Sequence, residues 1–519
     1  MSGGWPLLAP VLVPLLGACL CALLWTNARA QAAVTTVTAG VLFVASVQLV
    51  LAVADGTVLA TRFGGWEAPA SIAFAADRLS GAMVGVTGLL ALAVAVYALA
   101  DVRRVALASG FHPLFCALLA GVNGAFLTAD LFNLYVWFEV MLIASFGLLV
   151  LDKSAGQLDG GIKYLALNML GTLVFLTAIA LLYGLTGTLN LADMGLAIRG
   201  LEGSAALHAG LWLLALGFLM KSGAFPLFSW LPASYHTGSI AVTAIFAGLL
   251  TKVGVYALIR LFTLVAPIGG TGMQTALLVI AVLTMVTGVL GAAIQWDVRR
   301  ILSFHIVSQI GYMLLGLALF TPYAIAAAVF YVVHHIVVKA NLFLLAGVIG
   351  RRGGSFDLRR NGGLLELSPL VAVLFLVPAM SLGGIPPLSG FWAKLMVIDA
   401  GLRVGAWVAI GFALAVGLLT LYSMGKIWMY AFWRAPAEGA DRAGIGALRL
   451  APIAGLAAVT LLIGLYAEPL VAFSLAAGEQ LLDPVDYVAA VLPGAEWPAP
   501  AAPPVDRIAG VDRIAGVRP

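Results

Sequence analysis

Fourteen apolar segments, each about as long as a bilayer-spanning helix, run through this sequence. Hydrophobic residues make up 62% of the 519 positions and charged residues only 10%, which excludes a set of water-soluble domains. The approximate limits of the segments are 5–25, 31–52, 78–100, 113–128, 131–151, 161–186, 206–228, 239–265, 274–294, 301–320, 323–350, 368–398, 404–431 and 449–474. We therefore expect an all-α polytopic membrane protein with about 14 transmembrane helices.

Basic residues are unequally distributed among the connecting loops. Fourteen Lys and Arg side chains fall in the odd-numbered loops, and five fall in the even-numbered loops and their flanks, Arg260 being counted among these five. Because cytoplasmic loops carry the excess of positive charge, both termini are expected on the non-cytoplasmic side. The formal charge of +4 is thus a topology signal, and no nucleic-acid partner is expected.

Helix-breaking residues interrupt two of the apolar segments beside lysines. Gly223 and Pro226 follow Lys221 in the seventh segment, and the run 383–390, rich in Gly and Pro, precedes Lys394 in the twelfth. We expect helices seven and twelve to be discontinuous, and breaks five spans apart predict two inverted five-helix repeats, helices 4–8 and 9–13. The predicted divisions are 1–100 (helices 1–3), 113–265 and 274–431 (the two repeats), 449–474 (helix 14) and 495–519 (a disordered tail).

Five of the seven lysines lie inside apolar segments, as does the carboxylate Glu139. These lysines are Lys221, Lys252, Lys339, Lys394 and Lys426. A charge at the centre of a spanning helix costs roughly 2.5–3.5 kcal/mol, so such residues are expected to be paired, hydrated or functional. Lys394 and Lys426 lie nearer the segment ends, where a lysine stem can reach the interface, and for Lys426 an anchoring role is equally consistent with the sequence.

Two pairs of ionisable residues suggest a path for protons. Glu139 is expected to be a switchable partner of Lys221, because a close carboxylate favours the ammonium and separation favours release of its proton. The alternative is a permanently protonated or ion-paired Glu139 that only holds helices together. His335 and Lys339 are four residues apart on one helical face, which favours a relay with one mobile proton. His334 lies on another face, where packing is an equal alternative.

Helix ten carries one polar stripe on an otherwise apolar helix. The residues His305, Ser308, Gln309 and Tyr312 are spaced 0, 3, 4 and 7, so they share one face. This stripe can hold a water wire or make ordinary hydrogen bonds between helices. Asp130 precedes helix five, and we favour a helix cap over an ion site there. The three cysteines lie in apolar stretches and predict no metal site.

These residues resemble the proton-translocating family shared by respiratory complex I membrane subunits and Mrp-type Na+/H+ antiporters. The resemblance covers roughly helices three to thirteen. It rests on Glu139, on Lys221 with Pro226, on Lys252, on the stretch 334–347 with its doubled histidine, and on the stretch 383–391. The stretch 121–139 and the lysine at position 394 are most similar to the D subunits of Mrp antiporters.

The resemblance implies a secondary-transporter subunit rather than an enzyme, with no bound cofactor. It implies a relay in which Glu139 and Lys221 form the switch, Lys252, His335 and Lys339 the centre, and Lys394 the terminal site. Further candidates are His334, His305, Ser308, Gln309, Tyr312 and Lys426. Implied partners are other Mrp-type membrane subunits in a plasma-membrane hetero-oligomer, the bilayer, H+, and Na+ or another monovalent cation. The alternative is a proton-pumping subunit of a complex I-like NADH:quinone oxidoreductase or of a membrane-bound hydrogenase.

Overall fold

The computed structural model describes residues 4–66, 68–69, 71–201, 203–436 and 444–497. The predicted tail lies outside the described residues from position 498 onward. The helices are α1 (Trp5–Leu23), α2 (Ala28–Val53), α3 (Arg78–Asp101), α4 (Arg104–Ala108), α5 (Phe111–Leu127), α6 (Leu131–Leu149), α7 (Ala155–Thr186), α8 (Leu191–Ala197), α9 (Ala205–Ser222), α10 (Trp230–Ser234), α11 (Ile240–Arg260), α12 (Gly272–Ile294), α13 (Val298–Leu319), α14 (Pro322–Arg352), α15 (Leu364–Leu367), α16 (Pro369–Gly383), α17 (Ser389–Arg403), α18 (Trp407–Trp428), α19 (Ala447–Leu465), α20 (Glu468–Leu482) and α21 (Val485–Val491). One π-helical turn continues α11 over Leu261–Val265, and another continues α18 over Met429–Trp433.

The all-α polytopic membrane fold expected from the sequence is confirmed. Twelve helices among the described residues are long and apolar enough to cross a membrane, and α5 and α16 are shorter apolar helices at two other predicted positions. The total number of spans and the two inverted repeats stay predictions.

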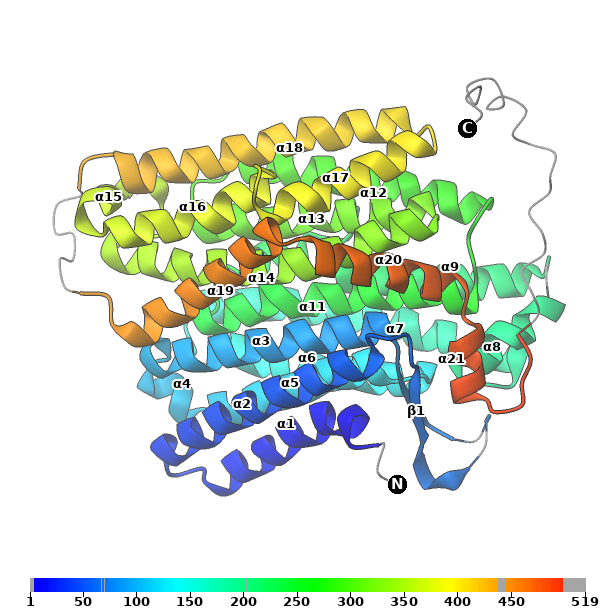
Figure 1. Cartoon of the computed structure of the whole chain (residues 1–519). Helices are drawn as coiled ribbons and strands as arrows, with labels where there is room; N and C mark the ends of the chain where they lie inside the picture. The colour runs from blue at the N-terminus through cyan, green and yellow to red at the C-terminus, as the bar shows by residue number, and fades with distance from the viewer. Residues whose placement is uncertain (1–3, 67, 70, 202, 437–443, 498–519) are drawn as a thin grey trace.

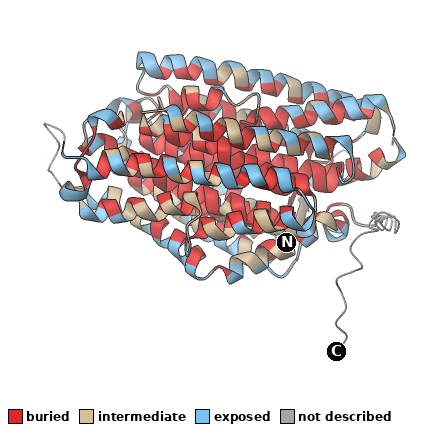
Figure 2. Ribbon diagram, turned by 90° about the horizontal axis from the view of Figure 1, so that it is seen from above, coloured by how far each residue is buried: buried red, intermediate tan, exposed pale blue. Residues whose placement is uncertain are grey.

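The long helices lie side by side in one bundle, with α1 and α2 at one edge and α18 at the other (Figure 1). Between these edges, α11, α13 and α14 are enclosed by other helices, and Figure 2 shows this buried centre surrounded by half-exposed outer helices. The lysines on α11 and α14 are therefore shielded by protein on all sides.

Both predicted helix interruptions are present. Helix α9 ends at Ser222 and α10 begins at Trp230, while α16 ends at Gly383 and α17 begins at Ser389. Gly223 (φ 74°) and Gly384 (φ 89°) close the preceding helices in the left-handed conformation, which glycine adopts at little cost. The prolines that follow cannot continue a helix, so the breaks are fixed locally.

The predicted single helix over 449–474 is wrong in extent. Helix α19 ends at Leu465, and α20 begins at Glu468 with Pro469 in its first turn, a position where proline starts a helix rather than continuing one. Both helices pack on α3 and α14, so the C-terminal part of the chain lies across the middle of the bundle (Figure 1).

A short antiparallel hairpin covers one end of the bundle. Strands β1 (Leu59–Arg62) and β2 (Ala73–Ala76) pair with Leu59 opposite Ala76, and α21 packs against both strands and α8. Nearby, the side chain of Asp130 accepts a hydrogen bond from the backbone N–H of Asn133 at 2.7 Å. The preference for a cap over an ion site at Asp130 is thus supported by its geometry. Burial raises the pKa of this carboxyl to about 6.

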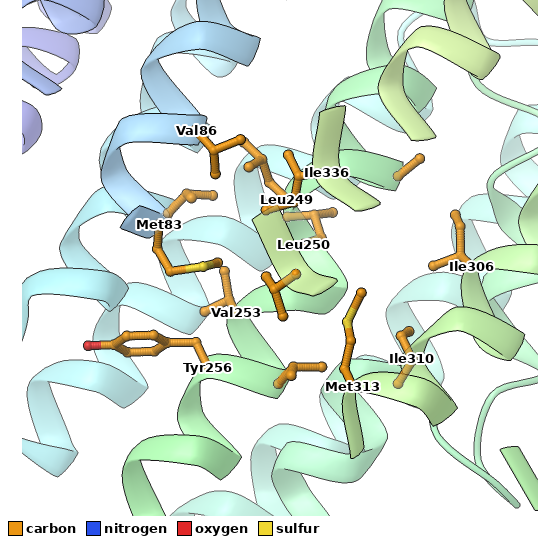
Figure 3. Packing of buried hydrophobic residues seen from close by; sticks show 14 of the residues in the cluster. Met83, Val86, Leu249, Leu250, Val253, Tyr256, Ile306, Ile310, Met313 and Ile336 are labelled. Atoms are coloured by element: carbon orange, nitrogen blue, oxygen red, sulfur yellow. The ribbon is translucent and has the colours of Figure 1, made fainter. Parts of the chain in front are cut away.

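Apolar side chains fill the contacts among α3, α11, α13 and α14. Figure 3 shows Met83 and Val86 of α3 facing Leu249 and Val253 of α11, with Ile310 of α13 beyond them. Such a core excludes water wherever its side chains interdigitate. Any polar group placed here must find a protein partner or remain without one.

Candidate functional site

The first polar group joins Lys221 of α9 to Glu139 of α6 through a residue that the sequence had not singled out. Lys221 Nζ donates hydrogen bonds to Thr172 Oγ1 at 2.8 Å and to the carbonyl of Asn168 at 3.2 Å. Thr172 Oγ1 in turn donates to Glu139 Oε1 at 2.8 Å. The chain of donors runs from ammonium to hydroxyl to carboxylate.

Thr172 connects Glu139 and Lys221 in this structure, and the switch between them stays a prediction. No ion pair within 4 Å joins Glu139 and Lys221 in the part of the chain that the structure describes. Glu139 is also half-buried rather than fully buried, because it lies on an outer face of α6. The signal for Thr172 was present in the sequence: Asn168 and Thr172 are four residues apart on one face of an apolar helix.

A small cavity adjoins Lys221 and reaches α11. It measures about 20 Å³ and is lined by Lys221, Asn168, Tyr164, Trp230 and Leu250, among others. A volume of this size holds one water molecule, and the hydrogen-bonding groups around it are those a bound water needs. Leu250 belongs to α11, so this cavity extends from Lys221 to the most buried helix of the bundle.

The second polar group lies at the buried centre, and we call it the central cluster: Lys252 of α11, His305 of α13, and His335 and Lys339 of α14. All four residues are 0% exposed. Lys252 Nζ donates to the carbonyl of Ala247 in its own helix. Lys339 Nζ and both ring nitrogens of each histidine make no hydrogen bond to any described residue.

The members of the central cluster are close enough to interact electrostatically. The helices that carry them, α11, α13 and α14, pack against one another in the buried centre. Several positive charges in a dry core would repel one another without compensation, so they cannot all be protonated at once at low cost. The central cluster therefore contains more groups that can bind a proton than it can have protonated at one time.

The third polar group surrounds the break between α16 and α17. Lys394 Nζ donates to the carbonyl of Gly383 at 3.0 Å and lies 5.4 Å from the ring centre of Tyr312. His334 Nδ1 is 2.8 Å from Ser389 Oγ, at the first residue of α17. His334 therefore bonds to the broken helix, while His335, the next residue, belongs to the central cluster.

The polar stripe on α13 divides among different partners. Ser308 donates to the carbonyl of Met285 on α12, an ordinary hydrogen bond between helices. Gln309 accepts from Tyr331 at 2.5 Å, and Tyr312 donates to the carbonyl of Ala413. Only His305 in this stripe is without a hydrogen-bond partner among the described residues. The stripe joins helices along most of its length.

Lys426 is held at the end of a helix. Its Nζ donates to the carbonyls of Ala293 and Gln295 at 2.7 and 2.6 Å, and it lies 4.8 Å from the ring centre of Trp296. These carbonyls belong to the C-terminus of α12, where a cation is stabilised by the helix dipole. The contacts favour the anchoring interpretation of this lysine.

A larger polar cavity lies away from these groups. It has a volume of about 470 Å³ and opens where α3 ends and α11 begins, at what we call the arginine-rich end. The arginines that line it are Arg103, Arg299, Arg351 and Arg449. None of the predicted relay residues is among its described lining residues.

Arg260 was placed by sequence in a loop flank, and this placement is wrong. It is a buried residue of α11, 5% exposed, and its guanidinium forms an ion pair with Asp77, which precedes α3. Lys252, Tyr256 and Arg260 follow one another at intervals of four residues, and this was the missed signal of a shared helical face.

No group of three or more His, Cys, Asp or Glu side chains in the described ranges is arranged to hold a metal ion.

Comparisons with known proteins agree over nearly the whole chain. Residues 128–420 match the family model described as NADH:quinone oxidoreductase/Mrp antiporter, transmembrane. The D subunit of the Na(+)/H(+) antiporter of Alkalihalophilus pseudofirmus is 41% identical over 485 residues, which cover 93% of this chain and 98% of that protein.

Two solved structures share the fold. A chain in the Mrp complex from Dietzia sp. is 36% identical with a TM-score of 0.89, and the match covers 95% of this chain and all of that one. A chain of the membrane-bound sulfane sulfur reductase, an archaeal respiratory membrane complex, is 25% identical with a TM-score of 0.88, and the match covers 94% and 99%. The similarity therefore spans the three polar groups described above.

Proposed function

This chain belongs to the NADH:quinone oxidoreductase/Mrp antiporter family of membrane proteins, and we propose that it is the proton-translocating subunit of a multisubunit Na+/H+ antiporter. It is a transporter subunit, not an enzyme. Protons moving inward down their electrochemical gradient would drive Na+, or another monovalent cation, outward. Each proton that crosses 100 mV releases about 2.3 kcal/mol, which can be used for this extrusion.

The observation that carries the proposal is the bridge from Lys221 through Thr172 to Glu139. A proton can leave the ammonium for the hydroxyl oxygen while the hydroxyl proton passes to the carboxylate. The products are a neutral amine, an unchanged threonine and a neutral carboxylic acid, so atoms and charge balance. The exchange removes two opposite charges together, which makes it sensitive to any movement of α6, α7 or α9.

From Lys221 the proposed route continues to Lys252, then to His335 and Lys339, and finally to Lys394. The water-sized cavity beside Lys221 supports the first step, and the unsatisfied nitrogens of the central cluster support the second. The position of Lys394 beside Tyr312, on the same helix α13 as His305 of the central cluster, supports the third. His334, Ser308, Gln309, Tyr312 and Lys426 are secondary candidates with mainly structural contacts.

The setting of this activity is part of the proposal. Relatives of this chain function within complexes of several membrane subunits, and we infer such partners here. The plasma membrane is the proposed location, with the arginine-rich end facing the cytoplasm and both termini on the other side. The repeats over helices 4–8 and 9–13 would place the relay at their boundary.

Sodium-driven proton movement tests the proposal. Inverted membrane vesicles containing the complete assembly should show a pH change on addition of Na+. Glu139→Ala and Lys221→Ala should each abolish this change, while Lys153→Ala, at an exposed loop lysine, should leave it intact. Assembly is checked by copurification of the companion subunits. Sodium-dependent proton movement that persists in both relay variants would contradict the proposed route.

The alternative is a proton-pumping subunit of a complex I-like oxidoreductase or a membrane-bound hydrogenase, favoured by the TM-score of 0.88 to the archaeal respiratory complex. The higher identity to an antiporter subunit argues for the antiporter. Purifying the native assembly decides between them. Iron-sulfur or flavin subunits among the partners would exclude the antiporter, and membrane subunits alone would support it.

A further inference from the structure

Helix α11 carries a polar stripe that leads away from the central cluster. Lys252, Tyr256 and Arg260 are four residues apart and share one face, which we call the α11 stripe. At 1.5 Å per residue, Arg260 lies about 12 Å beyond Lys252 along the helix. The arginine-rich end is at the start of α11, so the stripe runs toward the opposite end, where the β1–β2 hairpin and α21 lie (Figure 1).

The outer part of this stripe belongs to a hydrogen-bond network that engages both terminal nitrogens of the Arg260 guanidinium, while Arg260 Nε has no partner among the described residues. Arg260 Nη1 donates to Asp77 Oδ2 at 2.7 Å, and Arg260 Nη2 donates to Asp77 Oδ1 at 2.9 Å and to Ser80 Oγ at 3.3 Å. Tyr256 donates to the carbonyl of Phe126 at 2.7 Å. The ring of Tyr487, on α21, covers the guanidinium with its centre 4.8 Å away.

Both charges of this pair are fixed. Burial by itself raises the pKa of Asp77, but the Arg260 guanidinium outweighs it and holds the pKa below its ordinary value. The carboxylate also caps α3 by accepting from the N–H of Ser80 at 2.9 Å. A guanidinium has five donors, no acceptor and no accessible neutral form, so it cannot receive a proton from a neighbour.

Little space is left for water beside the network. The cavity next to Tyr256 and Arg260 measures about 10 Å³, at the lower limit for a single water molecule. A proton-conducting chain needs groups or waters that both accept and donate. The α11 stripe ends instead in a donor-only group packed against a small cavity.

We propose that the Asp77–Arg260 pair is a proton-blocking seal, which closes the α11 stripe so that a proton on Lys252 moves along the relay and not past Arg260 to the far surface. The inference rests on the proposed function, since a seal matters only if Lys252 carries protons. Without it, a proton could pass from Lys252 to the far surface without reaching Lys339, and transport would be uncoupled from cation movement.

The test is proton leak in the absence of Na+, measured on the assembled complex in vesicles as the decay of an imposed pH gradient. In Asp77→Asn/Arg260→Gln both charges are removed and the glutamine amide can accept as well as donate. This double variant should lose the gradient several-fold faster than the wild type. Asp77→Glu keeps both charges of the pair and should stay tight, as should Arg62→Gln, at an exposed arginine of the same end.

Several results would overturn the seal. A double variant that is tight and fully active in sodium-driven exchange makes the pair purely structural. A double variant that is tight but inactive places the pair on the conducting route. A leak in Asp77→Glu equal to that of the double variant makes packing, not charge, the cause. If the double variant does not assemble, Asp77→Asn decides, because it keeps the guanidinium and must remain tight.

Failure of the seal is distinguishable from failure of the proposed function. Sodium-driven proton movement in the wild type tests the function and needs no variant at Asp77 or Arg260. A leak without Na+ tests the seal and needs no exchange activity.

Discussion

Two cations on the same buried helix, Lys252 and Arg260, differ in how completely their hydrogen bonds are satisfied. Arg260 shares both oxygens of Asp77 and lies under an aromatic ring. Lys252 has one backbone carbonyl, and it shares the buried centre with a lysine and two histidines whose side-chain nitrogens have no partner among the described residues. An ion pair fixes the charge of Arg260, whereas the charge of Lys252 depends on which of the groups around it carry protons. The comparison separates structural charge from transport charge within one helix.

The largest expected effect is at Lys252. Lys252→Met should reduce sodium-driven proton movement about a hundredfold or more, because a proton-transfer group is lost from the route. The assembled complex should nevertheless be as stable as the wild type or more so, since an apolar side chain of similar length suits a dry core better than an unpaired amine. The initial rate in vesicles measures transport, and the thermal dissociation temperature in detergent measures the stability of the complex. Retained transport, or a strong loss of stability, would remove the contrast with Arg260.

Arg260→Met should lower the stability of the assembled complex, in contrast to Lys252→Met. Removing one partner leaves Asp77 buried and uncompensated, which costs about 3–5 kcal/mol in the free energy of unfolding. Asp77→Leu/Arg260→Met should recover most of that loss, because neither charge remains. The thermal dissociation temperature of the purified assembly is compared between the single and the double variant. Equal stability of the single and double variants would show that the pair is not the source of the stabilisation.

A smaller effect is expected at the bridge. Thr172→Val keeps the shape of the side chain but removes the hydroxyl between Lys221 and Glu139, and transport should fall about tenfold, as for one hydrogen bond to a charged group. Thr172→Ser keeps the hydroxyl and should preserve most of the rate. The initial rate of sodium-induced pH change measures both. Equal rates in the valine and serine variants would mean that the hydroxyl takes no part in transfer.

The smallest effect is expected at Lys426, whose contacts resemble those of Arg260 more than those of Lys252. Lys426→Met should lower the free energy of unfolding by about 1 kcal/mol, because two carbonyls of α12 lose a donor, and should leave transport nearly unchanged. Sodium-induced pH change in vesicles measures transport, and thermal dissociation of the complex measures stability. A collapse of transport in this variant would move Lys426 into the relay.

Much of the fold followed from local sequence. Lipid requires every backbone group to be satisfied within the chain, so apolar runs of sufficient length become helices. The breaks beside Lys221 and Lys394 followed from Gly and Pro, which act on their own residues and immediate neighbours. The C-terminal interruption at Glu468 was missed, although Pro469 marked it in the sequence.

Much less of the site could be predicted. Spacing placed His335 and Lys339 on one face, but it could not show that Thr172 lies between Lys221 and Glu139, because three separate helices meet there. Nor could it show which of the adjacent histidines reaches Ser389. These are choices of partner, and each depends on how helices far apart in the chain pack together.

The sequence by itself determined that this chain is a helical membrane protein with charged side chains deep in its spans, because hydropathy and helix breaks act locally. Tertiary structure alone decided which of those side chains form an ion pair and which do not. Asp77 and Arg260 are 183 residues apart, and only the packing of α3 against α11 brings them together. The packing of α11 against α14 gives Lys252 one backbone carbonyl and leaves Lys339 Nζ without a hydrogen-bond partner among the described residues.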